Sequence, residues 1–252
     1  MKIKMMNFPN AAGVALSARM DFPAQGDYHA VALFAHCFTC TKNINSAAYI
    51  SSYLTRQGFA VFRFDFTGLG GSQGDFAETN FATNVEDLVS AAEFLGENYQ
   101  APQLLIGHSL GGTAVIQAAG RIASSKALVT IGSPADPRHV LTHLKDAVDK
   151  IEESGEAVVN LAGRPFRIKK QFITDLEQTD LGSVLKHLNK AILILHSPTD
   201  NTVGIEHAGA LFQTARHPKS FISLDRTDHL LSRKIDAEYA AGIIAAWVRR
   251  YL

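Results

Sequence analysis

The chain has 252 residues, and its 24 Lys and Arg residues balance 24 Asp and Glu residues, giving a formal net charge of zero. A composition of 46% hydrophobic and 19% charged residues is typical of a globular protein with a large core. The balanced charge argues against nucleic acid or an anionic membrane as a partner, and neither a signal peptide nor an apolar run of about 20 residues is present, so we expect a cytoplasmic protein.

The first half of the chain alternates between predicted strands and predicted helices. Residues 1–20 alternate loosely between apolar and polar positions, which predicts one or two antiparallel strands. Short apolar runs predict buried strands, and apolar residues at helical spacing predict helices. The strands are expected at 29–35, 59–64, 104–106 and 127–131, and the helices at 44–57, 82–96 and 113–119. This order indicates a mostly parallel sheet with helices on both faces.

The alternation stops after Pro134 and resumes only at residue 191. The intervening segment predicts an amphipathic helix at 138–153, a hairpin at 158–168 that turns at Ala162 and Gly163, and a helix that contains Phe172. This stretch is too long for a connecting loop. We therefore predict a cap at 136–189, inserted into a core formed by 1–135 and 190–252. The core is completed by strands at 191–195 and 219–224 and helices at 204–215 and 235–250.

Residues 107–111, Gly-His-Ser-Leu-Gly, match the pattern G-x-S-x-G between a predicted strand and a predicted helix. In that context the pattern indicates a nucleophile elbow, in which the serine occupies a strained turn and the glycines let strand and helix approach closely. Ser109 is therefore the predicted nucleophile.

A serine hydroxyl needs a base to take its proton, and the base needs an orienting carboxylate. On a sheet of this type the order along the chain is nucleophile, acid, histidine, with each group at the carboxyl end of a strand. Asp200 and His229 satisfy both conditions, since they follow the strands at 191–195 and 219–224. His108 lies inside the elbow itself, and His196 precedes Asp200 in the chain, so both are less suitable as the base. Asp225 is the substitute acid if Asp200 fails, whereas Asp228 is expected to cap the following turn.

Acyl transfer also requires hydrogen-bond donors for the developing oxyanion. We expect the backbone N–H of Leu110 and the backbone N–H of Phe38, in the loop after the strand at 29–35, to supply them. His36 is expected to brace that loop.

Two further patterns suggest other chemistry and are interpreted as structural. Residues 68–71, Gly-Leu-Gly-Gly, follow a strand, but position 73 is Gln, so the dinucleotide fingerprint G-x-G-x-x-G fails. Cys37 and Cys40 form a C-x-x-C without a second pair or a thioredoxin-like context. We expect two buried thiols, whose oxidation would distort the oxyanion loop. No metal and no cofactor are expected.

At these residues the chain resembles the α/β-hydrolase superfamily: His36-Cys37-Phe38, the loop 65–72, the elbow at 107–112, Pro198-Thr199-Asp200 and Asp228-His229. The stretches 36–40 and 63–70 are similar to the hydrolase half of bacterial fusions with an OsmC-like domain, and the capped layout resembles feruloyl-esterase-like and monoglyceride-lipase-like enzymes. The resemblance implies an eight-stranded sheet, a Ser109–Asp200–His229 triad and ester hydrolysis without a cofactor. Cys37 departs from the pattern, because many members have Gly there.

These features predict a bacterial serine hydrolase, of carboxylesterase type, that cleaves small acyl or aryl esters through an acyl-enzyme. We expect the substrate pocket to include His36, His108, Phe166 and Phe172. The same triad could serve a thioesterase, lactonase, peptidase or acyltransferase, and the same fold could serve a ligand-binding protein with vestigial catalysis. The sequence leaves open the physiological substrate and whether the protein is a monomer or a homodimer.

Overall fold

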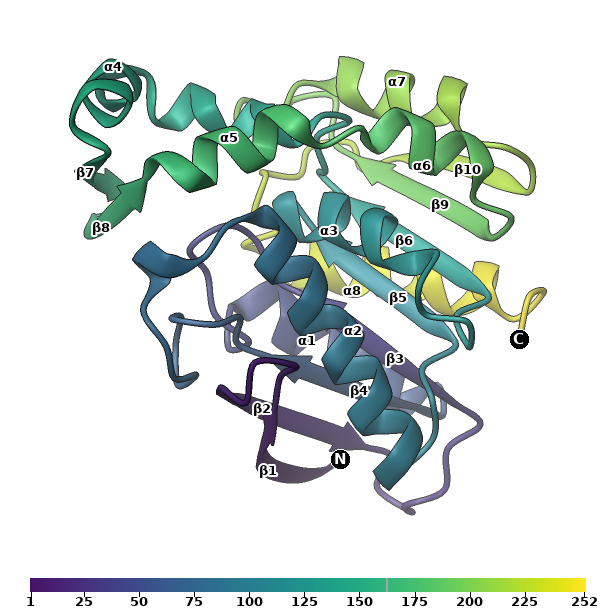
Figure 1. The fold of residues 1–252 in the computed structure, drawn as a ribbon. Coiled ribbons are helices and arrows are strands. Elements are labelled where there is room, and N and C mark those ends of the chain that lie inside the picture. The colour runs from purple at the N-terminus through teal and green to yellow at the C-terminus, as the bar shows by residue number, and fades with distance from the viewer. Residues whose placement is uncertain (162) are drawn as a thin grey trace.

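The computed structural model describes residues 1–161 and 163–252, without the side chain of Asp146. Its centre is an eight-stranded sheet with the order β1-β2-β4-β3-β5-β6-β9-β10 (Figure 1). The six strands from β4 to β10 pair in parallel, and β2 joins them antiparallel through β4. The predicted α/β-hydrolase-type sheet, mostly parallel and flanked by helices, is thereby confirmed.

The strands and helices of this layer lie close to the predicted ranges. The strands are β1 (Lys2–Pro9), β2 (Ala15–Phe22), β3 (Ala30–Ala35), β4 (Phe59–Phe64), β5 (Leu104–His108), β6 (Ala127–Ile131), β9 (Ala191–His196) and β10 (Lys219–Ser223). The helices around them are α1 (Asn45–Arg56), the 3₁₀ turn η1 (Phe76–Glu78), α2 (Phe81–Asn98), α3 (Leu110–Ala119), α7 (Ile205–Thr214) and α8 (Lys234–Val248). Every residue of β3, β4, β5, β6 and β9 is buried, as expected for parallel strands covered on both faces.

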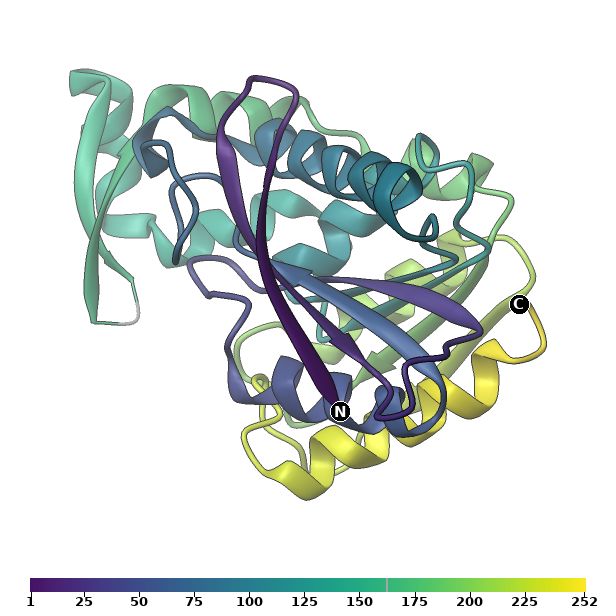
Figure 2. The same ribbon diagram turned by 90° about the horizontal axis from the view of Figure 1, so that it is seen from below.

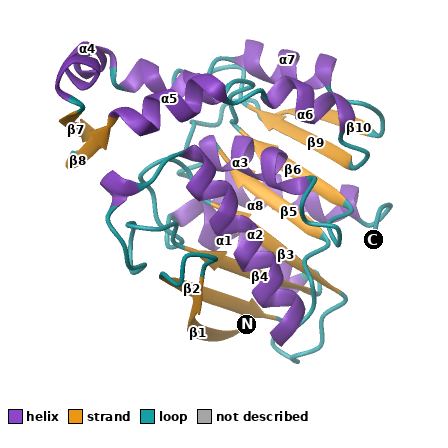
Figure 3. Cartoon of the chain, viewed as in Figure 1, coloured by secondary structure: helices purple, strands orange, loops and turns teal. Residues whose placement is uncertain are grey.

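Helices cover both faces of the sheet (Figures 2 and 3). The sheet therefore separates two hydrophobic clusters, one under each layer of helices. On one face α1 packs against α8, and their apolar side chains join those of the central strands. On the other face α2, α3, α6 (Leu181–His187) and α7 form a continuous layer. Local signals set the helix ends. The side chain of Asn80 accepts a hydrogen bond from the backbone N–H of Thr83, and the Thr83 hydroxyl accepts one from the backbone N–H of Asn80, which together cap the start of α2.

Between β6 and β9 the chain leaves the sheet, as the interrupted pattern predicts. This segment comprises the 3₁₀ helix η2 (Pro137–His143), α4 (Lys145–Ser154), the hairpin β7 (Glu156–Leu161) and β8 (Arg164–Lys169), α5 (Lys170–Gln178) and α6. The α4 helix and the hairpin project beyond the sheet, whereas α6 packs on α3 and α7 (Figure 1). The predicted turn residue Ala162 lies outside the described residues.

Two helical predictions in this segment differ from the structure. The helix expected at 138–153 is a 3₁₀ helix and an α-helix, because Leu144 between them has φ −110° and ψ 5°, outside the helical region. The helix that contains Phe172 is followed by the unpredicted helix α6, which begins where the carboxylate of Asp180 accepts the N–H of Ser183.

The strand order places the loops that matter at one point of the sheet. The chain passes from β3 to β4 on one side and later to β5 on the other, so β3 and β5 flank the position where the winding direction reverses. In open α/β sheets, ligands bind outside the carboxyl ends of strands at such a reversal. The loop after β3 and the elbow after β5 therefore meet there. Among the described residues, no helix is long and apolar enough to cross a membrane.

Candidate active site

Ser109 occupies a single-residue turn between β5 and α3. Its backbone has φ 54° and ψ −128°, a strained conformation for a residue with a side chain. The neighbouring glycines are required by close approach. A Cβ on Gly107 would lie 2.3 Å from the carbonyl oxygen of Gly111, and one on Gly111 would lie 2.4 Å from that of His36. The predicted elbow is therefore formed, with strand, helix and oxyanion loop in backbone contact around Ser109.

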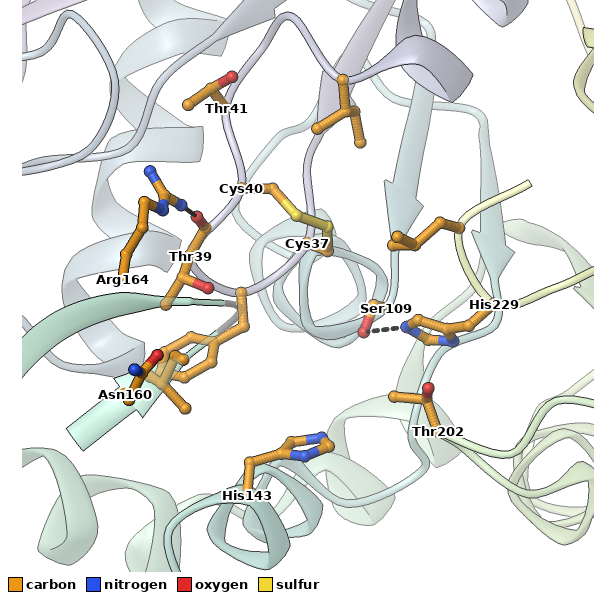
Figure 4. A pocket seen from close by; sticks show the side chains of 14 residues that line it. Cys37, Thr39, Cys40, Thr41, Ser109, His143, Asn160, Arg164, Thr202 and His229 are labelled. Atoms are coloured by element: carbon orange, nitrogen blue, oxygen red, sulfur yellow. Dashed lines mark hydrogen bonds between the residues drawn. A yellow bond between two sulfur atoms is a disulfide. The ribbon is translucent and has the colours of Figure 1, made fainter. Parts of the chain in front are cut away.

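The three residues predicted to act together lie in one hydrogen-bonded chain. His229 Nε2 lies 3.1 Å from Ser109 Oγ, and His229 Nδ1 lies 2.7 Å from Asp200 Oδ2 (Figure 4). An ionised carboxylate can only accept, so Nδ1 carries the proton and Nε2 is left to accept the Ser109 hydroxyl. This is the geometry in which a neutral imidazole can remove a proton from a serine.

Asp200 is held so that it stays ionised. Its second oxygen, Oδ1, accepts the backbone N–H groups of Thr202 and Val203, each at 2.9 Å. Burial by itself would raise the pKa of Asp200, but the hydrogen bonds from His229 and from these two backbone groups outweigh it, and the pKa lies below its usual value. The carboxylate is thus available to stabilise a protonated His229.

The competing acids and histidines have other partners. Asp225 accepts the hydroxyl of Ser223 at 2.6 Å on the surface, and Asp228 accepts the N–H of Ser232 at 2.9 Å, the capping role expected of it. His196 Nε2 donates to the carbonyl of Val203 at 2.8 Å. His108 Nε2 donates to the carbonyl of His229 at 2.7 Å and so supports the loop that carries His229. Burial and the nearby His229 lower the pKa of His108 to about 3, which keeps it neutral.

The two predicted oxyanion donors are both unengaged. Among the described residues, neither the backbone N–H of Leu110 nor that of Phe38 donates to another protein group. Leu110 begins α3, where the helix dipole favours negative charge. His36 supports the Phe38 loop, as expected, because its Nδ1 donates to the carbonyl of Cys37 at 2.8 Å.

The expectation of two free thiols in this loop is wrong. Cys37 and Cys40 form a disulfide, so residues 37–40 make a small covalent ring that contains Phe38 (Figure 4). Within the ring Thr39 has φ 59°, and the N–H of Cys40 donates to the carbonyl of Cys37 at 3.1 Å. The local spacing allowed this bond, but C-x-x-C alone does not distinguish a disulfide from two thiols.

Buried ionic groups hold the far end of the same loop. Lys42, only 4% exposed, pairs its ammonium with Asp65 at 2.5 Å, and Asp65 also accepts the backbone N–H of Lys42 and that of Gly71. The guanidinium of Arg63 donates to the carbonyl of Lys42. The glycine-rich loop after β4 therefore supports the oxyanion loop, which agrees with its interpretation as structural.

A cavity of about 610 Å³ opens at Ser109 and His229. Its walls come from three places: the oxyanion loop, the loops after β9 and β10, and the segment between β6 and β9. Besides Ser109 and His229, the lining residues are Cys37, Phe38, Thr39, Cys40, Thr41, Ile44, His143, Asn160, Leu161, Arg164, Thr202 and Leu230.

The four residues expected in the substrate pocket do not line this cavity. His36 and His108 are each 1% exposed and turn towards backbone carbonyls beneath it. Phe172 stacks on Phe38 with ring centroids 5.4 Å apart, and Phe166 packs edge-on against Phe76. These aromatic rings support the cavity wall from behind, because the apolar face of the hairpin and α5 is used to bind the core.

The sequence did not predict that polar residues of the hairpin and of η2 would line the cavity. Asn160, Arg164 and His143 reach the cavity only because the inserted segment folds back over the oxyanion loop. For Asn160 and Arg164, the signal available in the sequence was their polar character beside the hairpin turn. Among the described residues, no cluster of three or more His, Cys, Asp or Glu could hold a metal ion.

Comparisons with known proteins identify the family and the fold of the chain. The family model described as "Serine aminopeptidase, S33" matches residues 29–161, just over half of the chain. The esterase domain of a Rhodothermus marinus protein is 50% identical, covers 100% of this chain and 99% of its own, and superposes with a TM-score of 0.81.

More distant matches include a thioesterase and a ferulate-bound enzyme. The Mus musculus protein named "Palmitoyl-protein thioesterase ABHD10, mitochondrial" is 27% identical over 212 residues, which is 81% of this chain and 70% of that protein. Est1E from Butyrivibrio proteoclasticus, bound to ferulic acid, has a TM-score of 0.80 at 17% identity and covers 98% of each chain. At that identity the likeness concerns the fold alone.

Proposed function

The chain belongs to the α/β-hydrolase family whose model is described as "Serine aminopeptidase, S33", and from this premise we propose that it is a carboxylesterase that cleaves small acyl or aryl esters through Ser109. The observation that carries the proposal is the hydrogen-bonded chain Ser109–His229–Asp200 on a strained elbow, open to a cavity. The coarser statement, that the protein is an esterase-type hydrolase, agrees with the 50% identical esterase domain.

The proposed reaction begins with proton transfer from Ser109 to His229. The 3.1 Å contact allows Nε2 to take the hydroxyl proton as Oγ attacks the ester carbonyl. The resulting imidazolium is stabilised by Asp200, and the oxyanion is stabilised by the N–H groups of Leu110 and Phe38. His229 then returns the proton to the leaving alcohol, and water releases the acid from the acyl-enzyme by the same route.

We propose that residues 136–189 act as a cap on this site and that 1–135 and 190–252 form the catalytic core. The cap contributes Asn160, Leu161 and Arg164 to the cavity wall. A cavity of about 610 Å³, within the range of small-molecule sites, suits an ester with a short acyl chain or one aromatic ring.

The test is hydrolysis of p-nitrophenyl esters from acetate to octanoate by the wild type and by Ser109→Ala. We expect turnover that falls at longer chains and is reduced at least about 10⁴-fold in the variant. A folded wild-type protein that hydrolyses none of these esters would refute the esterase proposal and favour a ligand-binding role on the same fold.

Thioester hydrolysis is a second candidate, because the mouse relative is named a palmitoyl-protein thioesterase. The same triad can attack a thioester carbonyl. Comparing butanoyl and palmitoyl thioesters with the matching oxygen esters distinguishes the two functions. A higher kcat/KM for thioesters at equal chain length would make thioesterase the better description.

A further inference from the structure

The strand β8 and the start of α5 carry four cations, and they differ in one respect. Arg167 lies 2.9 Å from a carboxylate oxygen of Asp75, Lys169 pairs with Glu78, and Lys170 lies 2.6 Å from Glu152. For Arg164, the first residue of β8, the described residues provide no carboxylate within ion-pair distance. The other three cations of this stretch are thus paired with carboxylates of the protein, and Arg164 differs from them.

Arg164 is also the one of the four that faces the catalytic cavity. Its Nη2 donates to the carbonyl of Thr39 in the oxyanion loop (Figure 4). Its guanidinium lies 5.2 Å above the ring of Phe166. A guanidinium has five N–H donors arranged to fit a carboxylate. The contact with Thr39 uses one of them and holds the group at the mouth of the cavity, so most donors remain available to a ligand.

The charge of the cavity favours an anion. None of the described Asp and Glu residues lines it, and Asp200 lies behind His229, 8% exposed. His143 is neutral at pH 7, because burial, followed by the nearby His139 and His229, lowers its pKa. Among the described residues that line the cavity, Arg164 is therefore the one with a permanent charge. Figure 4 shows Arg164 and Asn160 on one side of the cavity and Ser109 and His229 on the other.

We infer that Arg164 binds a carboxylate of the substrate, and that the preferred substrates are esters bearing a free carboxylate, such as half-esters of dicarboxylic acids. This inference rests on the proposed esterase function. The ester carbonyl lies at Ser109, and the chain of the substrate extends along the cavity to the hairpin, where the guanidinium and the amide of Asn160 receive the carboxylate.

The test compares two acyl groups of equal length. The mono-p-nitrophenyl ester of glutaric acid carries a terminal carboxylate, and p-nitrophenyl pentanoate carries a methyl group instead. We expect Arg164→Gln to lower kcat/KM for the glutarate ester about 10- to 100-fold, the range for a charge-assisted hydrogen bond, and to change the pentanoate ester less than about threefold. Arg167→Gln on the same strand is the matched control and should leave both unchanged.

A carboxylate on the leaving group is covered by a second pair, 4-carboxyphenyl butanoate and 4-carbamoylphenyl butanoate. Selective loss on the carboxylate member of either pair supports the inference. Equal loss on charged and neutral members would instead indicate a structural role through Thr39, and no loss on either pair would also overturn it.

Failure of the esterase proposal is recognised separately. If the wild type hydrolyses none of the four esters, binding of monomethyl glutarate and of methyl pentanoate to the full chain is measured by calorimetry. Binding of monomethyl glutarate that is weakened in Arg164→Gln but retained in Arg167→Gln keeps the anion site while discarding the reaction. Absence of binding, or equal binding to all three proteins, overturns the site as well.

Discussion

Replacing Gly111 with alanine tests whether the elbow and the oxyanion loop are in backbone contact as the structure shows. A Cβ at this position would lie 2.4 Å from the carbonyl oxygen of His36 and 2.6 Å from that of Ala35. Ordinary contacts begin at 3.4 Å, so the end of β3 or the start of α3 must move by about 1 Å. Both contacting atoms belong to the backbone, and no side-chain rotation can relieve the overlap.

We expect Gly111→Ala to lower the free energy of unfolding by about 1–3 kcal/mol, the cost of overpacking a filled core. The displaced backbone leads into the Phe38 loop, so kcat on p-nitrophenyl butanoate should fall at least about tenfold. Complete loss of one oxyanion donor lowers kcat about 10²- to 10³-fold.

Gly120→Ala is the matched control. Gly120 follows the same helix with φ −63° and ψ −28°, and a Cβ there meets nothing within 4 Å. This change should raise the unfolding free energy by about 0.4–1 kcal/mol, because the unfolded chain loses entropy, and should leave kcat unaltered. The measurements are urea unfolding and steady-state kinetics. If Gly111→Ala were as stable and as active as Gly120→Ala, the contact between elbow and loop would be refuted.

Three further predictions follow from the site and its surroundings. Asp200→Asn should lower kcat about 10⁴-fold by stabilising the wrong histidine tautomer, with little change in substrate KM; a loss below tenfold would reject Asp200 as the acid. Replacing both Cys37 and Cys40 with Ser should cost about 2 kcal/mol of stability, the entropy of closing a four-residue ring, and should lower kcat; unchanged kcat would mean that the ring does not order the loop. Burial lowers the pKa of His108 to about 3 and that of His36 to about 4. Below pH 6.5 these two rings are therefore protonated in the unfolded chain but still neutral in the folded protein. As the pH is lowered from 6.5 towards 4, the unfolding free energy should therefore fall, with a slope that approaches about 1.4 kcal/mol per pH unit for each ring at most and is reduced in His108→Asn; a flat profile would contradict their burial as neutral groups.

Local patterns in the sequence determined the sheet and the order of the candidate catalytic residues. The strand before Asp200, β9, is a short buried apolar run with a distinct end, and β10, before His229, is a partly exposed edge strand. Because both strands are parallel to their neighbours, the residues that follow them lie at the carboxyl edge of the sheet. The glycines around Ser109 identify the turn, because only they permit the close approach. These inferences need no knowledge of which elements are neighbours.

The tertiary structure alone decided what surrounds the serine. Phe172 and Arg164 belong to the same inserted segment, yet Phe172 packs against Phe38 from behind while Arg164 lines the cavity. Periodicity indicates that a side chain is buried, but not whether it is buried in a core or beside a ligand. The pairing of Cys37 with Cys40, and the lack of a carboxylate beside Arg164 in the described part of the chain, likewise depend on distances between atoms. Such distances are set by long-range packing, which no local pattern of residue types contains.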